Sequence, residues 1–265
     1  MRTRNGIAAM AKQERLGRWM KGLMRVASRV LYNEPLVLLS ESYLRGYYTW
    51  KRRWGRAPRD PKIDWYDHRA DLYHWSKSRN PLWVERGVMS RQVMFPGCQV
   101  LDLCCGDGFY PYYFYAEVPA RVDALDSDHR AVRHAMRWHS HPNIRYWVRD
   151  ALKEEFPAPE YDVISWDAGI QYFTPEQMRI ILGKCFRALE PRGGVLTGYT
   201  VLAEQGKKYH RRHKYEFTSS EELAGFLEGF FPFAGTLETQ YPKRRNVYFR
   251  AAFSRDRLGG FSSSK

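Results

Sequence analysis

From residue 96 onward the sequence alternates short apolar runs with helical patterns, and this alternation is its strongest constraint on the fold. Apolar runs rich in β-forming residues occupy 99–103, 121–126, 143–148, 161–166 and 194–200, and helical spacing occupies 108–117, 128–139 and 174–189. Strands and helices in alternation form right-handed βαβ units, which place a parallel sheet between two helical layers. The pattern predicts an α/β, Rossmann-like fold with a mostly parallel sheet.

The C-terminal part of the sequence continues this pattern and then loses it. Ser219 and Ser220 precede the helical stretch "EELAGFLEGFF", and two strand-like runs follow at 233–240 and 245–253, joined by a polar turn. The end of the chain reads "GGFSSSK", which is short of residues that could bury a core. We therefore expect residues 254–265 to be a disordered tail.

The positive charge of the chain is concentrated at its N-terminal end. The first 60 residues hold 14 Lys and Arg against four acidic residues, so +10 of the formal net charge of +14 lies there. Residues 51–62 then combine basic residues with prolines, which is typical of a solvated linker. We predict that residues 1–62 are a basic helical extension with its linker, attached to a domain at 63–253.

Within this extension, residues 7–32 have the pattern of a basic amphipathic helix. Apolar residues recur every three or four positions, with arginines and lysines on the opposite face. The apolar stripe could pack on the domain, or it could bind an anionic membrane surface with its arginines near the headgroups. A cleaved organellar transit segment is a third interpretation, since the stretch is rich in Arg and poor in acids.

The cysteines and the length of the apolar runs indicate in which cellular compartment the protein is expected. The four cysteines, Cys98, Cys104, Cys105 and Cys185, have no spacing that suits a zinc site or a disulfide framework. Every apolar run is much shorter than the stretch of about 20 residues that a membrane-spanning helix requires. We therefore expect no metal, a reducing compartment and a cytoplasmic protein, which the basic helix could attach peripherally to a membrane.

The stretch "VLDLCCGDGF" at 100–109 combines a strand with a turn that contains two glycines. Gly106 and Gly108 permit a sharp turn and let a ligand approach the backbone without meeting a Cβ atom. The stretch lacks the Gly-Lys-Ser/Thr ending of a phosphate-binding P-loop. Asp102 at the strand end would repel a pyrophosphate but attract a cation, so a nucleoside that carries an ammonium group fits this turn better.

Acidic or aromatic side chains stand at the ends of the next three strands as well. Asp126 ends the second strand, where a carboxylate can accept hydrogen bonds from ribose hydroxyls. Asp150 and Ala151 end the third strand, where they can bind an adenine amino group and ring. Trp166 and Asp167 end the fourth. Because the carboxyl ends of parallel strands meet at one edge of the sheet, these groups should line one crevice.

With these motifs, residues 63–253 resemble the class I S-adenosylmethionine-dependent methyltransferases. The resemblance rests on "VLDLCCGDG", "VDALDSD", "RYWVRDA", "YDVISWDAGIQYF" and "CFRALEPRGGVL", and the lead-in "DHRADLYHW" and "PLWVERG" looks most like bacterial members thought to act on small molecules or saccharides. It implies an enzyme with a seven-stranded sheet whose last strand is antiparallel. It also implies S-adenosyl-L-methionine as cofactor, with S-adenosyl-L-homocysteine as product.

The resemblance also implies which residues contact the cofactor. It carries this role to Asp102, Gly106, Asp126, Asp150 and Ala151, and we add Cys104, Gly108 and Trp166 from the same turn and rim. Cys104 stands where the family usually has a glycine, and we interpret both cysteines of the turn as small buried residues rather than reactive groups.

Candidate catalytic residues depend on the acceptor. If the acceptor is a hydroxyl, a base must remove its proton during attack. Asp167 is the first candidate base, and His213, with Glu216 as its orienting partner, is the second. We expect residues 63–94 to form a helical lid and 201–218 an insertion on the acceptor side.

The function that these observations favour is O-methylation of a small-molecule or glycan-type acceptor. An RNA methyltransferase that uses the basic extension is the alternative. Against it, the fourth strand ends in "SWDAG" rather than in the Asp/Asn-Pro-Pro-aromatic tetrad with which base methyltransferases hold an amine. A dehydrogenase is disfavoured by Asp102 and by the missing third glycine. The sequence leaves the acceptor atom and the oligomeric state open.

Overall fold

The computed structural model describes residues 19–24, 26, 27, 39, 43, 82–204, 208–241 and 244–263. The chain divides into two units, residues 1–60 and 61–265. In the first unit, residues 19–24, 26 and 27 are helical, as the amphipathic pattern predicts for this part of 7–32, and their side chains are exposed. The rest of that helix, the linker to residue 62 and the lead-in up to residue 81 lie outside the described residues.

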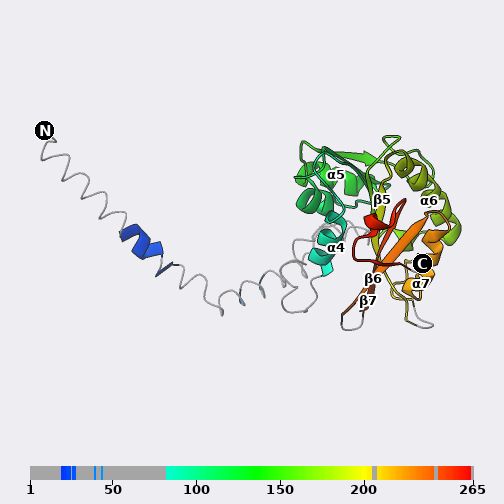
Figure 1. Ribbon diagram of the computed structural model, residues 1–265. Coiled ribbons are helices and arrows are strands. Elements are labelled where there is room, and N and C mark those ends of the chain that lie inside the picture. Colours follow the sequence, from blue (N-terminus) through cyan, green and yellow to red (C-terminus); the bar gives the residue numbers. More distant parts are fainter. Residues whose placement is uncertain are drawn as a thin grey trace, which may run out of the picture. The chain divides into compact units, whose positions relative to one another are not determined.

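The second unit is built on one mixed sheet (Figure 1). Its strands are β1 (Gln99–Leu103), β2 (Arg121–Asp126), β3 (Ile144–Val148), β4 (Val163–Asp167), β5 (Val195–Val201), β6 (Phe233–Tyr241), β7 (Arg244–Ala252) and β8 (Ser262–Ser263). They lie in the order β3-β2-β1-β4-β5-β7-β6-β8. β1 to β5 are mutually parallel, and β7 pairs antiparallel with both β5 and β6. The mostly parallel α/β sheet predicted from the sequence is confirmed.

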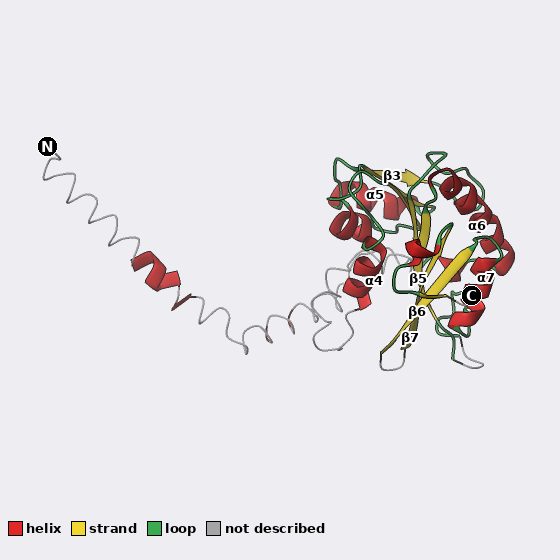
Figure 2. Cartoon of the chain, in the orientation of Figure 1, coloured by secondary structure: helices red, strands yellow, loops and turns green. Residues whose placement is uncertain are grey.

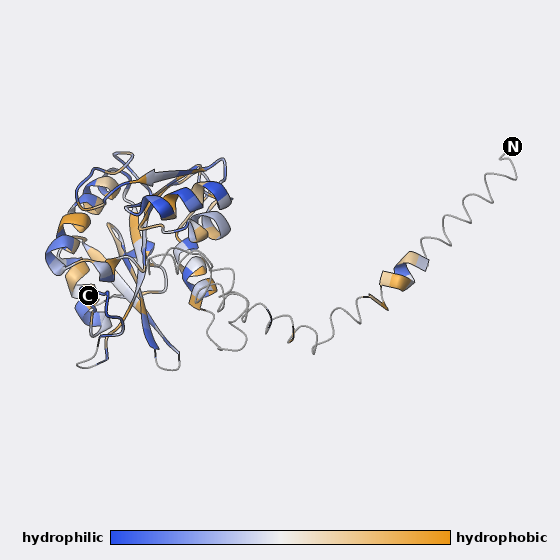
Figure 3. Ribbon diagram, turned by 180° about the vertical axis from the view of Figure 1, so that it is seen from behind, coloured by the Kyte–Doolittle hydropathy of each residue, from blue (hydrophilic) through white to orange (hydrophobic). Residues whose placement is uncertain are grey.

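Helices cover both faces of this sheet (Figure 2). They are α4 (Leu82–Arg91), the π-helical turn η2 (Pro111–Tyr115), α5 (His129–Trp138), η3 (Ile170–Tyr172), α6 (Pro175–Leu189), η4 (Glu190–Arg192), α7 (Ser220–Glu228) and η5 (Arg255–Leu258). The side of α6 and α7 buries one apolar cluster against β1, β4, β5 and β7, and the side of α4 and η2 buries another. Figure 3 shows hydrophilic residues along α5 and at the far end of the β6–β7 hairpin.

Local sequence determines where the long helices begin. Thr174 accepts a hydrogen bond from the backbone N–H of Gln177, and the Gln177 side chain accepts one from the Thr174 N–H, so α6 begins with a complete capping box. Asp128 and Ser219 cap α5 and α7 in the same way, each accepting from one backbone N–H. No helix in the described part of the chain is long and apolar enough to cross a membrane.

The C-terminal tail differs from the sequence-based expectation. Residues 254–263 are ordered, with η5 followed by β8, and Ser262 and Ser263 pair antiparallel with Thr236 and Gly235 of β6. The reason is apolar burial, since Leu258 is fully buried and Phe261 covers the Arg250 guanidinium, at 4.1 Å from its ring centroid. The prediction that residues 254–265 are disordered is therefore wrong for residues 254–263.

Two glycines with opposite surroundings test this packing. A Cβ atom at Gly198 of β5 would lie 2.4 Å from the Trp166 carbonyl oxygen and 2.4 Å from the Phe249 ring, whereas one at Gly225 of α7 would meet nothing within 4 Å. We expect Gly198→Ala to lower the free energy of unfolding by about 3 kcal/mol, since backbone and core must shift.

Gly225→Ala should instead raise the free energy of unfolding by about 0.5–1 kcal/mol, because alanine restricts the unfolded chain and favours the helix. Urea unfolding followed by circular dichroism measures both. A Gly198→Ala protein as stable as the unchanged chain would contradict the close approach of β5 to β4.

Candidate functional site

A cavity of about 600 Å³ opens at the carboxyl edge of the sheet, beyond the ends of β1 to β4. This is the edge at which open α/β sheets bind ligands, and the volume is in the usual range for small-molecule sites. Its lining includes Cys104, Gly106, Leu125, Asp126, Ser127, Asp128, Ala131, Arg149, Asp150, Ala151, Leu152, Lys153, Ala168, Gly169, Tyr172, Phe173, Gln177, Arg212 and Lys214.

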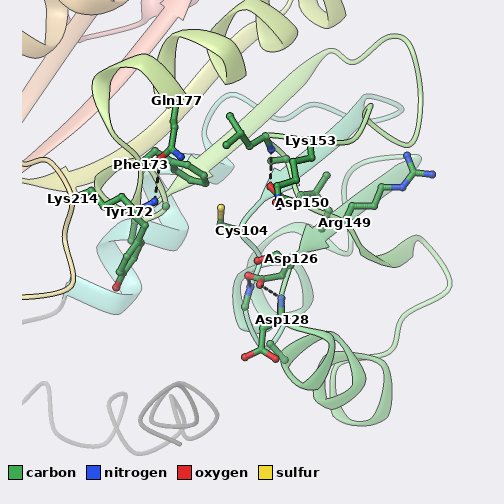
Figure 4. Close-up of a pocket in the computed structure, with 18 of the residues that line it drawn as sticks. Cys104, Asp126, Asp128, Arg149, Asp150, Lys153, Tyr172, Phe173, Gln177 and Lys214 are labelled. Atoms are coloured by element: carbon green, nitrogen blue, oxygen red, sulfur yellow. Dashed lines mark hydrogen bonds and ion pairs between the residues drawn. The ribbon is translucent and has the colours of Figure 1, made fainter.

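Figure 4 shows two walls that face each other across Cys104. One wall, here called the acidic wall, contains Asp126, Asp128 and Asp150 from the ends of β2 and β3. The opposite one, here called the basic wall, contains Tyr172, Phe173, Gln177 and Lys214. We assign Arg212 to it as well, because Arg212 lines the cavity and its charge acts on Tyr172. The acidic wall and the turn after β1 are the parts that the sequence predicted.

The turn after β1 is shaped by residues in the left-handed region. Gly106 and Gly108 have φ of +57° and +77°, and Cys104, with φ of +62°, takes the same conformation although it is not a glycine. Ala168 at the end of β4 has φ of +52° and also lines the cavity. Such backbone costs about 1 kcal/mol or more for a residue with a Cβ, and it is typical of sites where backbone meets a ligand.

Asp126 connects the loops after β1 and β2. One carboxylate oxygen accepts from the backbone N–H of Gly106 at 3.0 Å, and the other accepts from that of Asp128 at 2.8 Å. The backbone N–H of Cys105 adds a bond to the Leu125 carbonyl at 3.0 Å. Asp126 lines the cavity at the point where these two loops meet.

The turn after β3 presents Asp150 and Ala151 to the cavity and is anchored from behind by a buried lysine. Lys184 of α6 is 8% exposed, and its ammonium donates to the carbonyls of Ala151, Leu152 and Glu154 at 3.2, 3.2 and 2.8 Å. An ammonium has three donors, and here all three are used. The backbone that would contact a bound base is therefore held from α6.

Three expected cofactor-binding residues lie behind the cavity wall. Asp102, Gly108 and Trp166 do not line the cavity, and each is buried. Burial, and then the nearby charge of Asp167, raises the pKa of Asp102 well above its usual range. A Cβ atom at Gly108 would lie 2.6 Å from the Tyr146 hydroxyl. These residues shape the turn and its support, and their role as direct contacts stays a prediction.

Asp167, the first candidate base, forms a buried ion pair. Arg86 of α4 donates through Nη2 to Oδ2 at 2.5 Å and through Nε to the same oxygen at 2.9 Å. The two side chains are 7% and 4% exposed, and Asp167 is not part of the cavity lining. Asp167 is therefore held in place by Arg86, and its role as a catalytic base stays a prediction.

The Arg86 guanidinium is enclosed by aromatic rings as well. The ring centroids of Trp83, Tyr110 and Tyr199 lie 5.0, 4.8 and 4.8 Å from its central carbon. Burial alone would lower the pKa of Arg86, but Asp167, Tyr110 and Tyr199 raise it on balance, so the group stays charged. Arg86 belongs to the motif "WVERG", but nothing in the sequence indicates that it pairs with Asp167, which lies 81 positions further along the chain.

His213 and Glu216 are brought together, as predicted. Glu216 accepts from His213 Nδ1 at 2.5 Å, and the side chains are 6% and 1% exposed. The His213 ring also packs edge-on against Tyr172, with centroids 5.2 Å apart. Burial has the largest effect on His213 and lowers its pKa, despite the opposing effect of Glu216. Tyr172 lines the cavity, whereas His213 lies directly behind it.

The cysteines behave as buried packing groups. Burial raises the pKa of Cys104, Cys105 and Cys185, which keeps these thiols protonated and unreactive at neutral pH. Within residues 82–204, 208–241 and 244–263 and the described helical residues before them, no group of three or more His, Cys, Asp or Glu could hold a metal ion.

Residues of the basic wall are the main part of the site that sequence reasoning missed. The motifs contain "IQYF" and the insertion contains "HRRHK", yet nothing in either indicates which side chain turns inward. Tyr172 and Gln177 reach the cavity from η3 and the first turn of α6, and Arg212 and Lys214 reach it from the loop after β5. The site is therefore completed by segments that the strand-end pattern does not include.

Comparisons with known proteins agree with this geometry. Residues 100–193 match the family model of the methyltransferase domain. Phosphoethanolamine N-methyltransferase of Plasmodium falciparum is 26% identical over 157 residues, which are 57% of this chain and 59% of that protein. An uncharacterised methyltransferase of Synechocystis is 33% identical over 98 residues, which are 37% of this chain and 45% of its own length. The chain thus spans about half the length of these curated relatives.

A solved structure has the same fold. N-methyltransferase NodS from Bradyrhizobium japonicum, in complex with S-adenosyl-L-homocysteine, aligns with a TM-score of 0.53 at 19% identity. The alignment covers 67% of this chain and 90% of that one.

The ion pair beneath the site generates a stability prediction. Arg86→Met leaves the Asp167 carboxylate buried without a counter-ion, so we expect it to lower the free energy of unfolding by about 3–5 kcal/mol. The double variant Arg86→Met/Asp167→Asn removes both charges and should recover part of that loss. Urea unfolding followed by tryptophan fluorescence measures all variants.

Arg192 supplies a partly exposed control: it lies 3.2 Å from Glu160 and 3.5 Å from Asp162, and its own side chain is 35% exposed. Arg192→Met should cost less than about 1 kcal/mol. If Arg86→Met lowered the free energy of unfolding no more than Arg192→Met does, the buried pair would not stabilise the fold as expected.

Proposed function

We propose that this chain, which belongs to the class I S-adenosylmethionine-dependent methyltransferases, methylates a hydroxyl group of a small-molecule or glycan-type acceptor. The observation that carries the proposal is the cavity at the carboxyl edge, where the ends of four neighbouring strands each contribute lining residues. A cavity of about 600 Å³ with one acidic and one basic wall has room for a nucleoside and a small second ligand.

The residues present fit the cofactor. Asp126 places a carboxylate in the cavity lining, the type of group that binds ribose hydroxyls, and the turn at Asp150 and Ala151 offers a carboxylate and a held backbone for an adenine. The left-handed turn at Cys104 and Gly106 lets backbone approach the ligand closely. S-adenosyl-L-methionine supplies a methyl group on a sulfonium, which needs orientation more than activation.

His213 is the base in this proposal, and Glu216 orients it. Hydrogen bonding of Nδ1 to Glu216 assigns the Nδ1 proton to that contact and leaves the Nε2 lone pair as the proton acceptor. The lowered pKa keeps the imidazole neutral at pH 7, which a general base requires. Because Tyr172 separates His213 from the cavity, the acceptor hydroxyl must approach beside the Tyr172 ring.

A small acceptor is favoured over RNA for two reasons. The cavity is bounded on both sides, and the Plasmodium falciparum relative is by its name a methyltransferase of phosphoethanolamine, a small molecule. That relative is an N-methyltransferase by its name. An amine acceptor in this chain would also have to lose a proton, and His213 would accept it just as it would from a hydroxyl. A transfer assay with labelled donor and fractionated extract tests the proposal, which expects label in small molecules or saccharides and is contradicted by label in RNA alone.

The base assignment predicts a loss of rate and a change of pH profile. In the transfer assay, His213→Gln should lower kcat by about 100-fold or more, with S-adenosyl-L-homocysteine affinity within about twofold of the unchanged chain. In the unchanged chain, kcat should fall as pH drops through the pKa of His213, below about 6.5, because the imidazole becomes protonated.

Tyr172→Phe is the matched variant, since it keeps the ring that packs on His213 and removes only the hydroxyl. It should retain the acid limb of the pH profile. Near-normal kcat in His213→Gln, or the same acid limb in that variant, would exclude His213 as the base.

A further inference from the structure

Charge is divided unequally between the two walls of the cavity. All acidic residues of the described lining, Asp126, Asp128 and Asp150, lie on the acidic wall. On that side Lys153 lies 3.6 Å from Asp150, and Arg149 donates to the Glu155 carbonyl at 2.7 Å. The basic wall contributes Arg212 and Lys214 and no acidic lining residue among those described.

The segment that carries these two cations is held in a defined conformation. Buried Glu216 accepts from the backbone N–H groups of Tyr209 and His210 at 2.6 and 3.0 Å, in addition to His213. The backbone N–H of Lys214 donates to the Gln171 carbonyl at 2.8 Å. Because the loop is fixed on both sides of Arg212, its side chains reach the cavity at a lower entropic cost on binding.

The start of α6 adds positive potential to the same wall. Gln177 lies in the first turn of this 15-residue helix and lines the cavity, and its side-chain oxygen accepts from the Lys214 ammonium at 3.1 Å. A helix N-terminus carries a partial positive charge. Glu176 in the same turn is exposed and is not part of the lining, so it does not place a carboxylate in the cavity.

We propose that the basic wall is an oxyanion subsite, in which Lys214 and Arg212 bind a phosphate or carboxylate group of the methyl acceptor. This inference rests on the proposed function, because it takes the ligand that carries the anion to be the methyl acceptor. Arginine and lysine are the side chains that bind phosphate and carboxylate groups through charge-assisted hydrogen bonds. The acidic wall repels such a group, so the charge division orients an anionic acceptor with its anion away from Asp126 and Asp150.

A small anionic molecule fits this subsite better than a nucleic acid does. The two cations line the cavity together with Tyr172, whereas Lys208 of the same loop is not part of the lining and donates to the carbonyls of His213 and Lys214. A nucleic-acid surface would use the exposed basic residues of the loop, including Arg211, as phosphate contacts.

Calorimetry on the full chain tests the subsite with inorganic phosphate as the probe, and with acetate in a parallel titration, both at constant ionic strength. We expect phosphate to bind with a Kd of about 1 mM, and the acetate arm to show whether a carboxylate suffices. Arg212→Gln and Lys214→Gln should each weaken phosphate binding about fivefold or more, and the double variant about 20-fold or more.

Arg211→Gln is the matched control, because Arg211 neighbours Arg212, is exposed and does not line the cavity. It should change phosphate affinity by less than about twofold. The double variant should also keep its S-adenosyl-L-homocysteine affinity, since that ligand belongs to the acidic wall.

Titrations with and without S-adenosyl-L-homocysteine separate the two hypotheses. Failure to bind this nucleoside contradicts the proposed function, while phosphate binding that depends on Arg212 and Lys214 still supports the subsite. Phosphate binding that is absent, or that is unchanged in the double variant, overturns the subsite. Tight binding of a single-stranded RNA that Arg211→Gln weakens as much as Arg212→Gln does also overturns it, in favour of a nucleic-acid surface.

Discussion

A buried guanidinium and a buried carboxylate hold the site together. Arg86 from α4 and Asp167 from the end of β4 are almost excluded from water, so neither charge is tolerable without the other. Their pairing ties the helix that precedes the sheet to the strand end that continues into Ala168, which lines the cavity in a left-handed conformation. The backbone of this part of the cavity floor is therefore set by an interaction that lies beneath it.

The cavity combines two electrostatic environments within one fold. Parallel strands bring Asp126 and Asp150 to one edge because their carboxyl ends point the same way. The opposite wall is built from α6 and from the loop that follows β5, and buried Glu216 organises that loop. A cationic nucleoside donor and an anionic acceptor would then lie on walls of opposite sign, which fixes their relative orientation before any chemistry occurs.

The sequence predicted the sheet and the acidic wall well because both follow from local patterns. Predicted strand 121–126 has the bounds of β2, and Asp126 and Asp150 line the cavity at the strand ends. The basic wall and the Arg86 pair depend on contacts between residues far apart in the sequence, which periodicity does not encode. The ordered tail was missed because Leu258 and Phe261 are isolated apolar residues whose burial depends on β6 and Arg250.

The central claim is that the acidic wall holds the methyl donor, and calorimetry with S-adenosyl-L-homocysteine tests it most directly. We expect the unchanged chain to bind with a Kd of micromolar order, and Asp126→Ala to weaken binding at least about 10-fold while the chain stays folded by circular dichroism. Glu117→Gln, at a side chain 89% exposed, should change nothing. No binding heat with this ligand but clear binding of NAD, or unchanged affinity in folded Asp126→Ala, would contradict the account.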